Sequence, residues 1–167
     1  MTVRPVITWG DPRLKQNSQD IGEWTPGLQR LVADMFETTL AEEGVGLAAP
    51  QLGININLVT IDISCGQDPS QQIVLINPEI TATEGTQTGS EGCLSVPGIT
   101  EMLDRPQKVW LKNRRPDGTW EELFGEDLLA RAFCHEIDHL RGRLFVELFG
   151  PVKRGMIQRK YLKLQKG

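Results

Sequence analysis

Two histidines and a glutamate lie in one stretch of the chain at the spacing of a metal-binding helix. Residues 128–142 read LLARAFCHEIDHLRG. At about 3.6 residues per turn, His135 and His139 lie one turn apart on the same helix face, so both imidazoles can reach one cation. Glu136 follows the first histidine. The resulting H-E-x-x-H pattern is typical of a metal-activated water with a carboxylate as general base.

These are the only two histidines among the 167 residues. An isolated histidine is more often a buried side chain satisfied by hydrogen bonds than a metal ligand. Because both histidines fall in one motif together with Glu136, we favour a metal site.

A catalytic metal usually takes three protein ligands and keeps one position for water, so a third donor must come from elsewhere in the chain. An extended zinc-peptidase pattern fails because Phe145 stands where its third histidine belongs. Glu147 follows the helix too closely to return to the metal. Cys134 projects about 100° away from His135, which favours packing over ligation.

Cys93 is the preferred third ligand. It lies between Gly92 and Leu94, where a strand edge could present its sulfur to the helix. A thiol bound to a divalent metal is deprotonated and becomes a strong ligand. The predicted metal site is therefore Cys93, His135 and His139.

The remaining elements must bury the metal helix. Its apolar residues recur at helical spacing, and Gly142 is expected to end it as a C′ residue. A second helix should begin with Thr25 as N-cap and Pro26 at N1 and run to about residue 42. Strands are expected at 56–63, 73–76 and 81–88, followed by a hairpin of 108–111 and 119–123. With a C-terminal helix from Pro151, this order predicts an α+β fold with antiparallel sheets packed around the metal-binding helix.

Length and composition further limit the number of domains and the class of protein. The length and a hydrophobic content of 39% predict one domain over residues 1–167. A net charge of −4 without long like-charge blocks argues against phosphate-driven nucleic-acid binding, and we expect no sequence-specific nucleic-acid partner. We expect a cytoplasmic protein without membrane partners, since no signal peptide or spanning segment is evident. Three cysteines in a reducing compartment do not predict a disulfide framework.

Three segments in this order resemble the peptide deformylase family: GVGLAAPQ at 44–51, EGCLS at 91–95 and HEIDH at 135–139. The resemblance extends to LINP at 75–78 and LLAR at 128–131. It implies a metal-dependent hydrolase that removes the N-formyl group from the formylmethionine of nascent polypeptides and releases formate.

Residue by residue, the resemblance implies that Cys93, His135 and His139 bind one divalent metal ion per chain. It implies iron(II) as the native metal, with zinc, nickel or cobalt able to substitute, and the ligand types permit several of these. Glu136 would be the catalytic acid and base. The Gln51 side-chain amide and the Leu94 backbone N–H would stabilise the oxyanion.

The resemblance also implies that the formylated peptide binds in extended form as an added strand, with its methionine side chain in an apolar pocket. The substrate-binding residues expected on this basis are Val45, Gly46, Gly92, Leu128 and Ala132. Two positions depart from some relatives, because Arg131 and Gly89 stand where bulkier apolar residues occur. With these two residues, the resemblance does not define the shape of the methionine pocket.

Two alternatives stay open at this point. A zincin-like metallopeptidase would share the water and the base but would cleave ordinary internal peptide bonds. A catalytically silent metal-binding or ribosome-associated module would use the same fold for recognition only. The basic tail from Lys153 to Lys166 could contact the ribosome, although such a tail is more often a solvated face.

Overall fold

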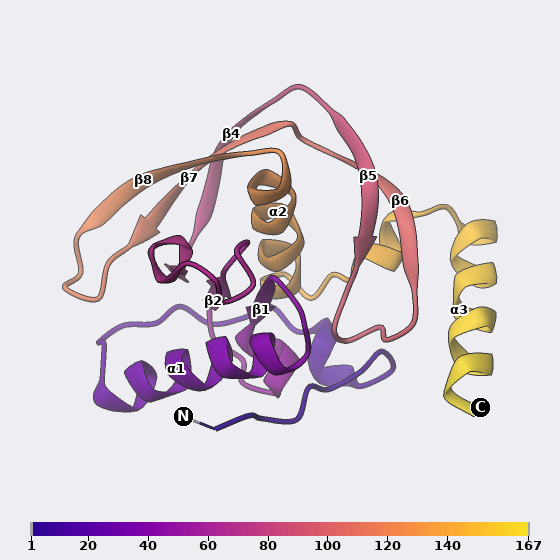
Figure 1. Ribbon diagram of the computed structural model, residues 1–167, viewed down its shortest axis with the longest axis horizontal. Coiled ribbons are helices and arrows are strands. Elements are labelled where there is room, and N and C mark those ends of the chain that lie inside the picture. The colour runs from indigo at the N-terminus through magenta and orange to yellow at the C-terminus, as the bar shows by residue number, and fades with distance from the viewer. Residues whose placement is uncertain (1, 167) are drawn as a thin grey trace.

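The helix with both histidines, α2 (Leu128–Leu140), lies near the centre of the molecule beneath an arch of long strands (Figure 1). The computed structural model describes residues 2–166. The other α-helices in this range are α1 (Pro26–Ala41), below α2 in the view, and α3 (Pro151–Lys166), at one side. Short 3-10 helices are η1 (Pro12–Lys15), η2 (Ala49–Leu52), η3 (Pro69–Gln71) and η4 (Phe145–Leu148).

The strands form three antiparallel sheets. Their orders are β1-β2-β3, β4-β7-β8 and β5-β6. The strands are β1 (Gly46–Ala48), β2 (Leu58–Ile61), β3 (Ile73–Ile76), β4 (Glu79–Glu84), β5 (Gln87–Gly92), β6 (Thr100–Arg105), β7 (Lys108–Arg114) and β8 (Trp120–Glu126). The predicted α+β class, antiparallel sheets and central helix are confirmed.

The core around α2 explains its central position. Phe133, Ile137 and Leu140 pack with buried residues of β2, β3 and β7 in one cluster. The helix ends where predicted, because Gly142 has φ +74° and donates its N–H to the His139 carbonyl at 3.1 Å. A Cβ at this position would lie 2.6 Å from the Lys15 carbonyl oxygen, so only glycine fits.

Two strand predictions were wrong in detail, and strands β1 and β6 were not predicted. The predicted strand at 81–88 is two strands, because Gly85 has φ +71° and turns the chain between β4 and β5. β2 is shorter than the predicted 56–63. Strand β6 was missed because its sequence, TEMLDR, is mostly polar, although Leu103 and Arg105 point inward. The strand at 73–76 and the hairpin of β7 and β8 are confirmed.

Helix α1 supports the strand that leads into the candidate site. It is capped as predicted, since the Thr25 hydroxyl accepts the Leu28 N–H at 3.2 Å. Its face with Leu31 and Met35 packs with Leu47 of β1 and Leu58 of β2. This packing fixes β1, which is the outer strand of its sheet.

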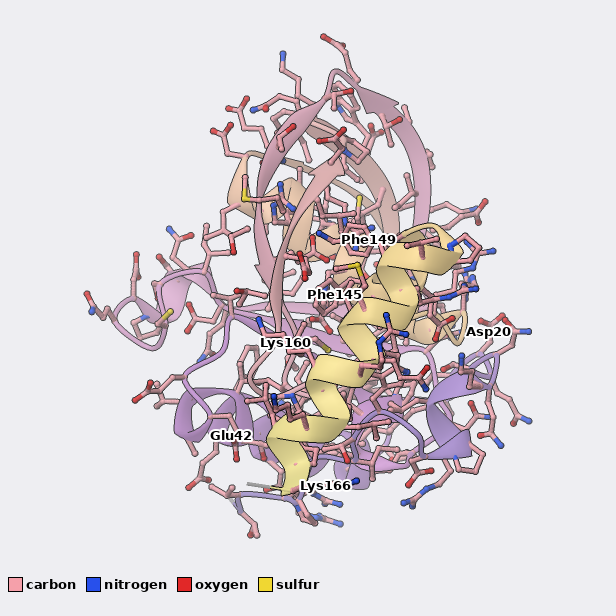
Figure 2. All side chains as sticks on the ribbon, turned by 90° about the vertical axis from the view of Figure 1, so that its right-hand side faces the viewer. Asp20, Glu42, Phe145, Phe149, Lys160 and Lys166 are labelled. Carbon is pink, nitrogen blue, oxygen red and sulfur yellow. The ribbon has the colours of Figure 1, made fainter. Side chains whose placement is uncertain are left out.

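Helix α3 lies across the outside of the molecule, as the side view shows (Figure 2). Ile157 and Tyr161 are its buried residues and pack with Phe145 and Val96. The Tyr161 ring also lies 5.2 Å from the ring of Trp9. None of the helices described here combines the length and the hydropathy needed to span a bilayer.

Candidate active site

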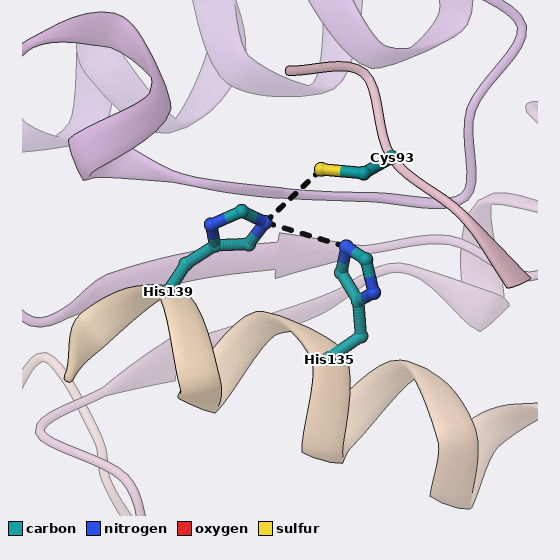
Figure 3. Close-up of side chains that lie close together, drawn as sticks. All are labelled: Cys93, His135 and His139. Atoms are coloured by element: carbon teal, nitrogen blue, oxygen red, sulfur yellow. Dashed lines mark hydrogen bonds between the residues drawn. The ribbon is translucent and has the colours of Figure 1, made fainter. Parts of the chain in front are cut away.

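The three predicted metal ligands converge in the structure (Figure 3). His135 and His139 project from successive turns of α2, and Cys93 lies just after β5. The Nε2 atom of His139 is 3.3 Å from Cys93 Sγ and 3.3 Å from His135 Nε2. All three potential donor atoms lie within 4.8 Å of one another. Both histidines are buried and the cysteine is half-buried, so the cluster is shielded from bulk water.

The chemistry of these donors fits a divalent transition metal. Nδ1 of His135 lies 2.7 Å from Oε2 of the ionised Glu91, so Nδ1 donates to this carboxylate and Nε2 is the ring atom that would face a metal ion. Burial holds the pKa of His139 well below its usual value, which keeps this ring neutral. Metal binding would displace the thiol proton and any proton on the Nε2 atoms, and the resulting thiolate and two imidazoles suit iron, cobalt, nickel or zinc better than magnesium or calcium.

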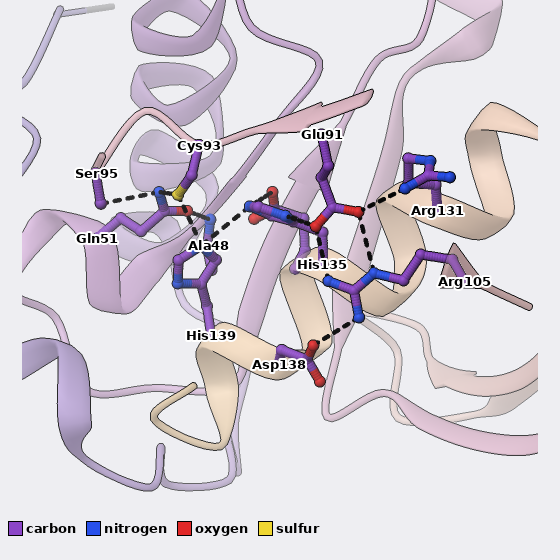
Figure 4. A network of polar contacts seen from close by, with 11 residues as sticks. Ala48, Gln51, Glu91, Cys93, Ser95, Arg105, Arg131, His135, Asp138 and His139 are labelled. Carbon is purple, nitrogen blue, oxygen red and sulfur yellow. Dashed lines mark hydrogen bonds and ion pairs between the residues drawn. The ribbon is translucent and has the colours of Figure 1, made fainter. Parts of the chain in front are cut away.

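Glu91 is the centre of a buried ion-pair network (Figure 4). Arg105 donates from Nε and Nη2 to the two Glu91 oxygens, at 3.0 and 2.7 Å, and from Nη1 to Asp138 at 2.9 Å. Arg131 donates from Nη1 to Glu91 Oε1 at 3.0 Å. Burial alone would raise the pKa of Glu91, but the hydrogen bonds from His135 and Arg105 outweigh it and lower that pKa to about 2. The network therefore fixes the carboxylate that orients His135.

Glu136 lies beside the cluster with one carboxylate oxygen unpaired. Its Oε1 is 3.8 Å from His135 Nε2, whereas Oε2 is buried and has no hydrogen-bond partner among residues 2–166. Burial raises the pKa of Glu136 to about 7. A buried carboxyl oxygen without a partner is costly unless another molecule satisfies it, and a water in the adjacent cavity could do so.

The side-chain amide of Gln51 is held in one orientation. Its Oε1 accepts the Ala48 N–H at 2.9 Å, so Nε2 must point toward the cluster, where it donates to Ser95 Oγ at 3.1 Å and lies 3.7 Å from Cys93 Sγ. Leu94 directly follows Cys93 and lines the adjacent cavity. The Gln51 amide N–H therefore lies beside the cluster, where a donor can meet the oxygen of a bound ligand.

A cavity of about 610 Å³ opens onto the cluster of Cys93, His135 and His139. It lies between β1 and β5, each of which is the outer strand of its sheet. His135 and Glu136 lie in its wall. All five predicted substrate-binding residues also line it: Val45, Gly46, Gly92, Leu128 and Ala132.

The rejected ligands lie elsewhere. Cys134 is buried in the cluster around Phe133, and burial raises the pKa of its thiol to about 11. The Glu147 carboxylate pairs with Lys15 Nζ at 2.7 Å. Packing therefore accounts for Cys134, and an ion pair accounts for Glu147.

The sequence interpretation did not single out Glu91, Arg105 or Ser95 for the roles of their side chains. One signal existed for Glu91, because alternate residues of β5 face α2 and a charged residue on an inward face needs a partner. That partner, Arg105, belongs to the strand that was missed. The contact of Ser95 with Gln51 joins residues 44 positions apart and has no local signature.

Comparisons with known proteins agree with this geometry. A family model described as Polypeptide deformylase matches residues 3–155. A peptide deformylase of Acidobacterium capsulatum is 46% identical over 99% of this chain and 98% of its own length, and one of Azotobacter vinelandii is 44% identical over 96% and 95%. The crystal structure of a peptide deformylase from Legionella pneumophila superposes with a TM-score of 0.92 at 41% identity, covering 99% of this chain and 96% of the other. A Synechococcus elongatus peptide deformylase in complex with actinonin gives 0.88 at 34% identity, covering 94% and 86%. The chain belongs to the polypeptide deformylase family.

Proposed function

We propose that Cys93, His135 and His139 hold one divalent metal ion, and that Glu136, Gln51 and Leu94 use this centre to hydrolyse a formyl amide. As a member of its family, the chain is a metal-dependent hydrolase that removes the N-formyl group from the formylmethionine of nascent polypeptides. The observation that best supports the residue assignment is the unpaired Glu136 oxygen, which lies beside three converging metal donors and a cavity.

Glu136 is the proposed acid and base. The bound metal ion would supply Lewis acidity and lower the pKa of a water molecule. Glu136 accepts a proton from the attacking water as its oxygen bonds to the formyl carbon, and then delivers that proton to the departing nitrogen as the C–N bond breaks. The products are formate and a peptide with a free amino terminus.

Gln51 and Leu94 are the proposed oxyanion donors. Negative charge develops on the formyl oxygen during attack, and preorganised N–H groups stabilise it most when they need no rearrangement. The Ala48 N–H and the Ser95 hydroxyl hold the Gln51 amide in place before substrate arrives. The backbone N–H of Leu94 would supply the second donor.

The proposed substrate position follows from the cavity. An extended peptide can add to the outer edge of β1 beside Val45 and Gly46, because that edge has no neighbouring strand in the described sheet. Gly92, on β5 across the cavity, has no side chain and would allow the peptide to come close to that strand. The methionine side chain would lie against Val45, Leu128 and Ala132.

We also propose iron(II) as the native metal, with zinc, nickel or cobalt able to replace it. One ion per chain is expected, since the cluster supplies three donors and a fourth position would remain for water. X-ray data collected at the absorption edge of the loaded metal should give one anomalous peak between Cys93, His135 and His139. A peak at another position would show that these three residues are not the metal ligands.

Ribosome contact by α3 is a further proposal. This helix contains six Lys or Arg residues and no Asp or Glu, and it exposes Val152 and Met156. A basic helix favours polyanionic RNA through salt-sensitive contacts. The wild type should cosediment with ribosomes at low salt, and a variant with Lys160 and Lys163 changed to Glu should not. Equal sedimentation of both proteins would contradict the proposed ribosome contact.

We propose a cytoplasmic location, because the substrates are nascent chains. A single catalytic domain over residues 1–167 is also proposed; Met1 and Gly167 lie outside the described residues. Its support is that one cluster, from Leu14 to Tyr161, joins both ends of the described chain.

A peptide panel tests the proposed function. Anaerobically purified protein loaded with iron or nickel should release formate from formyl-Met-Ala-Ser and should not cleave acetyl-Met-Ala-Ser. Cleavage of an internal bond in an uncapped peptide would favour the metallopeptidase. If the loaded protein releases neither formate nor peptide fragments, the silent binding module replaces the present proposal.

A further inference from the structure

Arg131 is a buried arginine on α2, one turn before His135. Only 6% of its surface is exposed. Its Nη1 atom donates to Glu91 Oε1 at 3.0 Å and to the Leu103 carbonyl at 3.1 Å. The side chain therefore joins α2 to both β5 and β6, and it also lines the cavity beside the metal cluster.

The contact with Glu91 completes the hydrogen bonding of that carboxylate. Oε1 accepts from Arg105 Nε and Arg131 Nη1, both at 3.0 Å. Oε2 accepts from Arg105 Nη2 and lies against His135 Nδ1, both at 2.7 Å. Two oxygens offer about four acceptor sites, so Glu91 has little freedom left to rotate. Any rotation would move the atom that orients the His135 ring.

Gly89 provides the space for this arrangement. It lies on β5 two residues before Glu91, on the same face, and pairs with Leu103 of β6. A Cβ at this position would lie 3.0 Å from Arg131 Nη2 and 3.5 Å from Cζ. The guanidinium therefore occupies the volume that a side chain at position 89 would need. This contact explains why glycine at position 89 occurs together with arginine at position 131.

We infer that Arg131 is a positioning residue for the metal ligand His135, acting through Glu91, and that Gly89 is required to admit its guanidinium. The inference rests on the proposed role of His135 as a ligand. Groups that orient a metal-binding histidine typically contribute about 10- to 100-fold to metal affinity. Because Arg131 supplies one of the four Glu91 contacts while Arg105 keeps two, we expect an effect at the lower end, about 10-fold.

The first test is the Arg131→Met variant, which keeps an unbranched side chain but removes the donor. The readout is the Co²⁺ dissociation constant, measured by competition with a chelator, together with the visible absorption of the bound cobalt. The variant should bind Co²⁺ about 10-fold more weakly, with an altered spectrum. Arg114→Met is the matched control. Arg114 belongs to β7, donates to the Ile21 carbonyl and makes no hydrogen bond to the proposed ligands. The control variant should bind cobalt as the wild type does.

Gly89→Ala provides an independent test without removing any hydrogen-bonding group. The added Cβ should displace the guanidinium and weaken Co²⁺ binding in the wild-type background. In the Arg131→Met background, the same substitution should have little further effect, whereas two unrelated packing defects would give additive losses. Circular dichroism and thermal unfolding should show that each variant is folded.

The outcomes separate this inference from the proposed metal site. Cys93→Ser should weaken Co²⁺ binding if the ligand set is right. If it does, but folded Arg131→Met binds cobalt with wild-type affinity and spectrum, the positioning role is wrong. Additive effects of the Gly89 and Arg131 substitutions would also overturn it. If Cys93→Ser binds cobalt as tightly as the wild type, the proposed metal site itself fails.

Discussion

Replacing Gly46 with alanine should move the catalytic carboxylate without touching a metal ligand. A Cβ at position 46 would lie 3.1 Å from both Cγ and Oε1 of Glu136 and 3.2 Å from Cδ. Carbon atoms pack best at about 3.5 to 4.0 Å, so one side must move by roughly half an ångström. Glu136 is only 4% exposed but borders the cavity, so its carboxylate is the group expected to shift.

The size of the effect follows from this displacement. Because misplacing a reacting group by about 1 Å can cost about 100-fold in rate, half that distance should lower kcat on the order of 10-fold, or about 1.4 kcal/mol. Steady-state formate release gives kcat and KM, and metal analysis gives the ion content per chain. Gly46→Ala should keep a full complement of metal, since the three atoms nearest to its new methyl group all belong to Glu136.

Gly22→Ala is the control for this experiment, because a Cβ there would meet no atom within 4 Å. It should have wild-type kinetics. Because Gly46 is also a proposed substrate-binding residue, KM can rise together with the fall in kcat. A rise in KM at constant kcat would show that the new methyl group obstructs the peptide without displacing the base. Wild-type kcat and KM in fully loaded Gly46→Ala would refute the reasoning.

Further predictions address the ligands, the oxyanion donor and the core. Cys93→Ser should lose metal to a chelator more readily than the wild type, because a hydroxyl is a weaker ligand than a thiolate; equal retention would point to another third ligand. In the metal-loaded protein, a thiol reagent should modify exposed Cys65 first and Cys93 only after chelation, which mass spectrometry of labelled peptides would show. Ser95→Ala removes the acceptor 3.1 Å from Gln51 Nε2 and should lower kcat about 10-fold, while Gln51→Ala should abolish this dependence on residue 95. Phe133→Ala, at a fully buried position, should lower the free energy of unfolding by about 3–5 kcal/mol in a denaturant titration.

The elements with strong local patterns could be predicted from the sequence. Thr25 and Pro26 mark the start of α1, and the apolar spacing and Gly142 mark α2, because capping and helical periodicity act over a few residues. The turn at Asp117-Gly118 likewise indicated the hairpin of β7 and β8. These local signals do not say which strands pair across the sequence.

The contacts that were missed are long-range and polar. β6 is mostly polar because one face is exposed and its inward Arg105 pairs with Glu91. Hydrophobic patterning could not reveal a strand stabilised in this way. The packing of Gly89 against Arg131 also depends on a contact across 42 residues, which composition and periodicity do not encode.

Formate release by Glu136→Gln at wild-type metal content tests the central claim most directly. Glutamine keeps the size of the side chain but cannot take up or deliver the proton, so turnover of formyl-Met-Ala-Ser should fall by about 10²- to 10⁴-fold. The metal content should stay at the wild-type level, since Cys93, His135 and His139 are intact. Near-wild-type formate release by this fully loaded variant would show that Glu136 is not the acid and base, and would contradict the proposed mechanism.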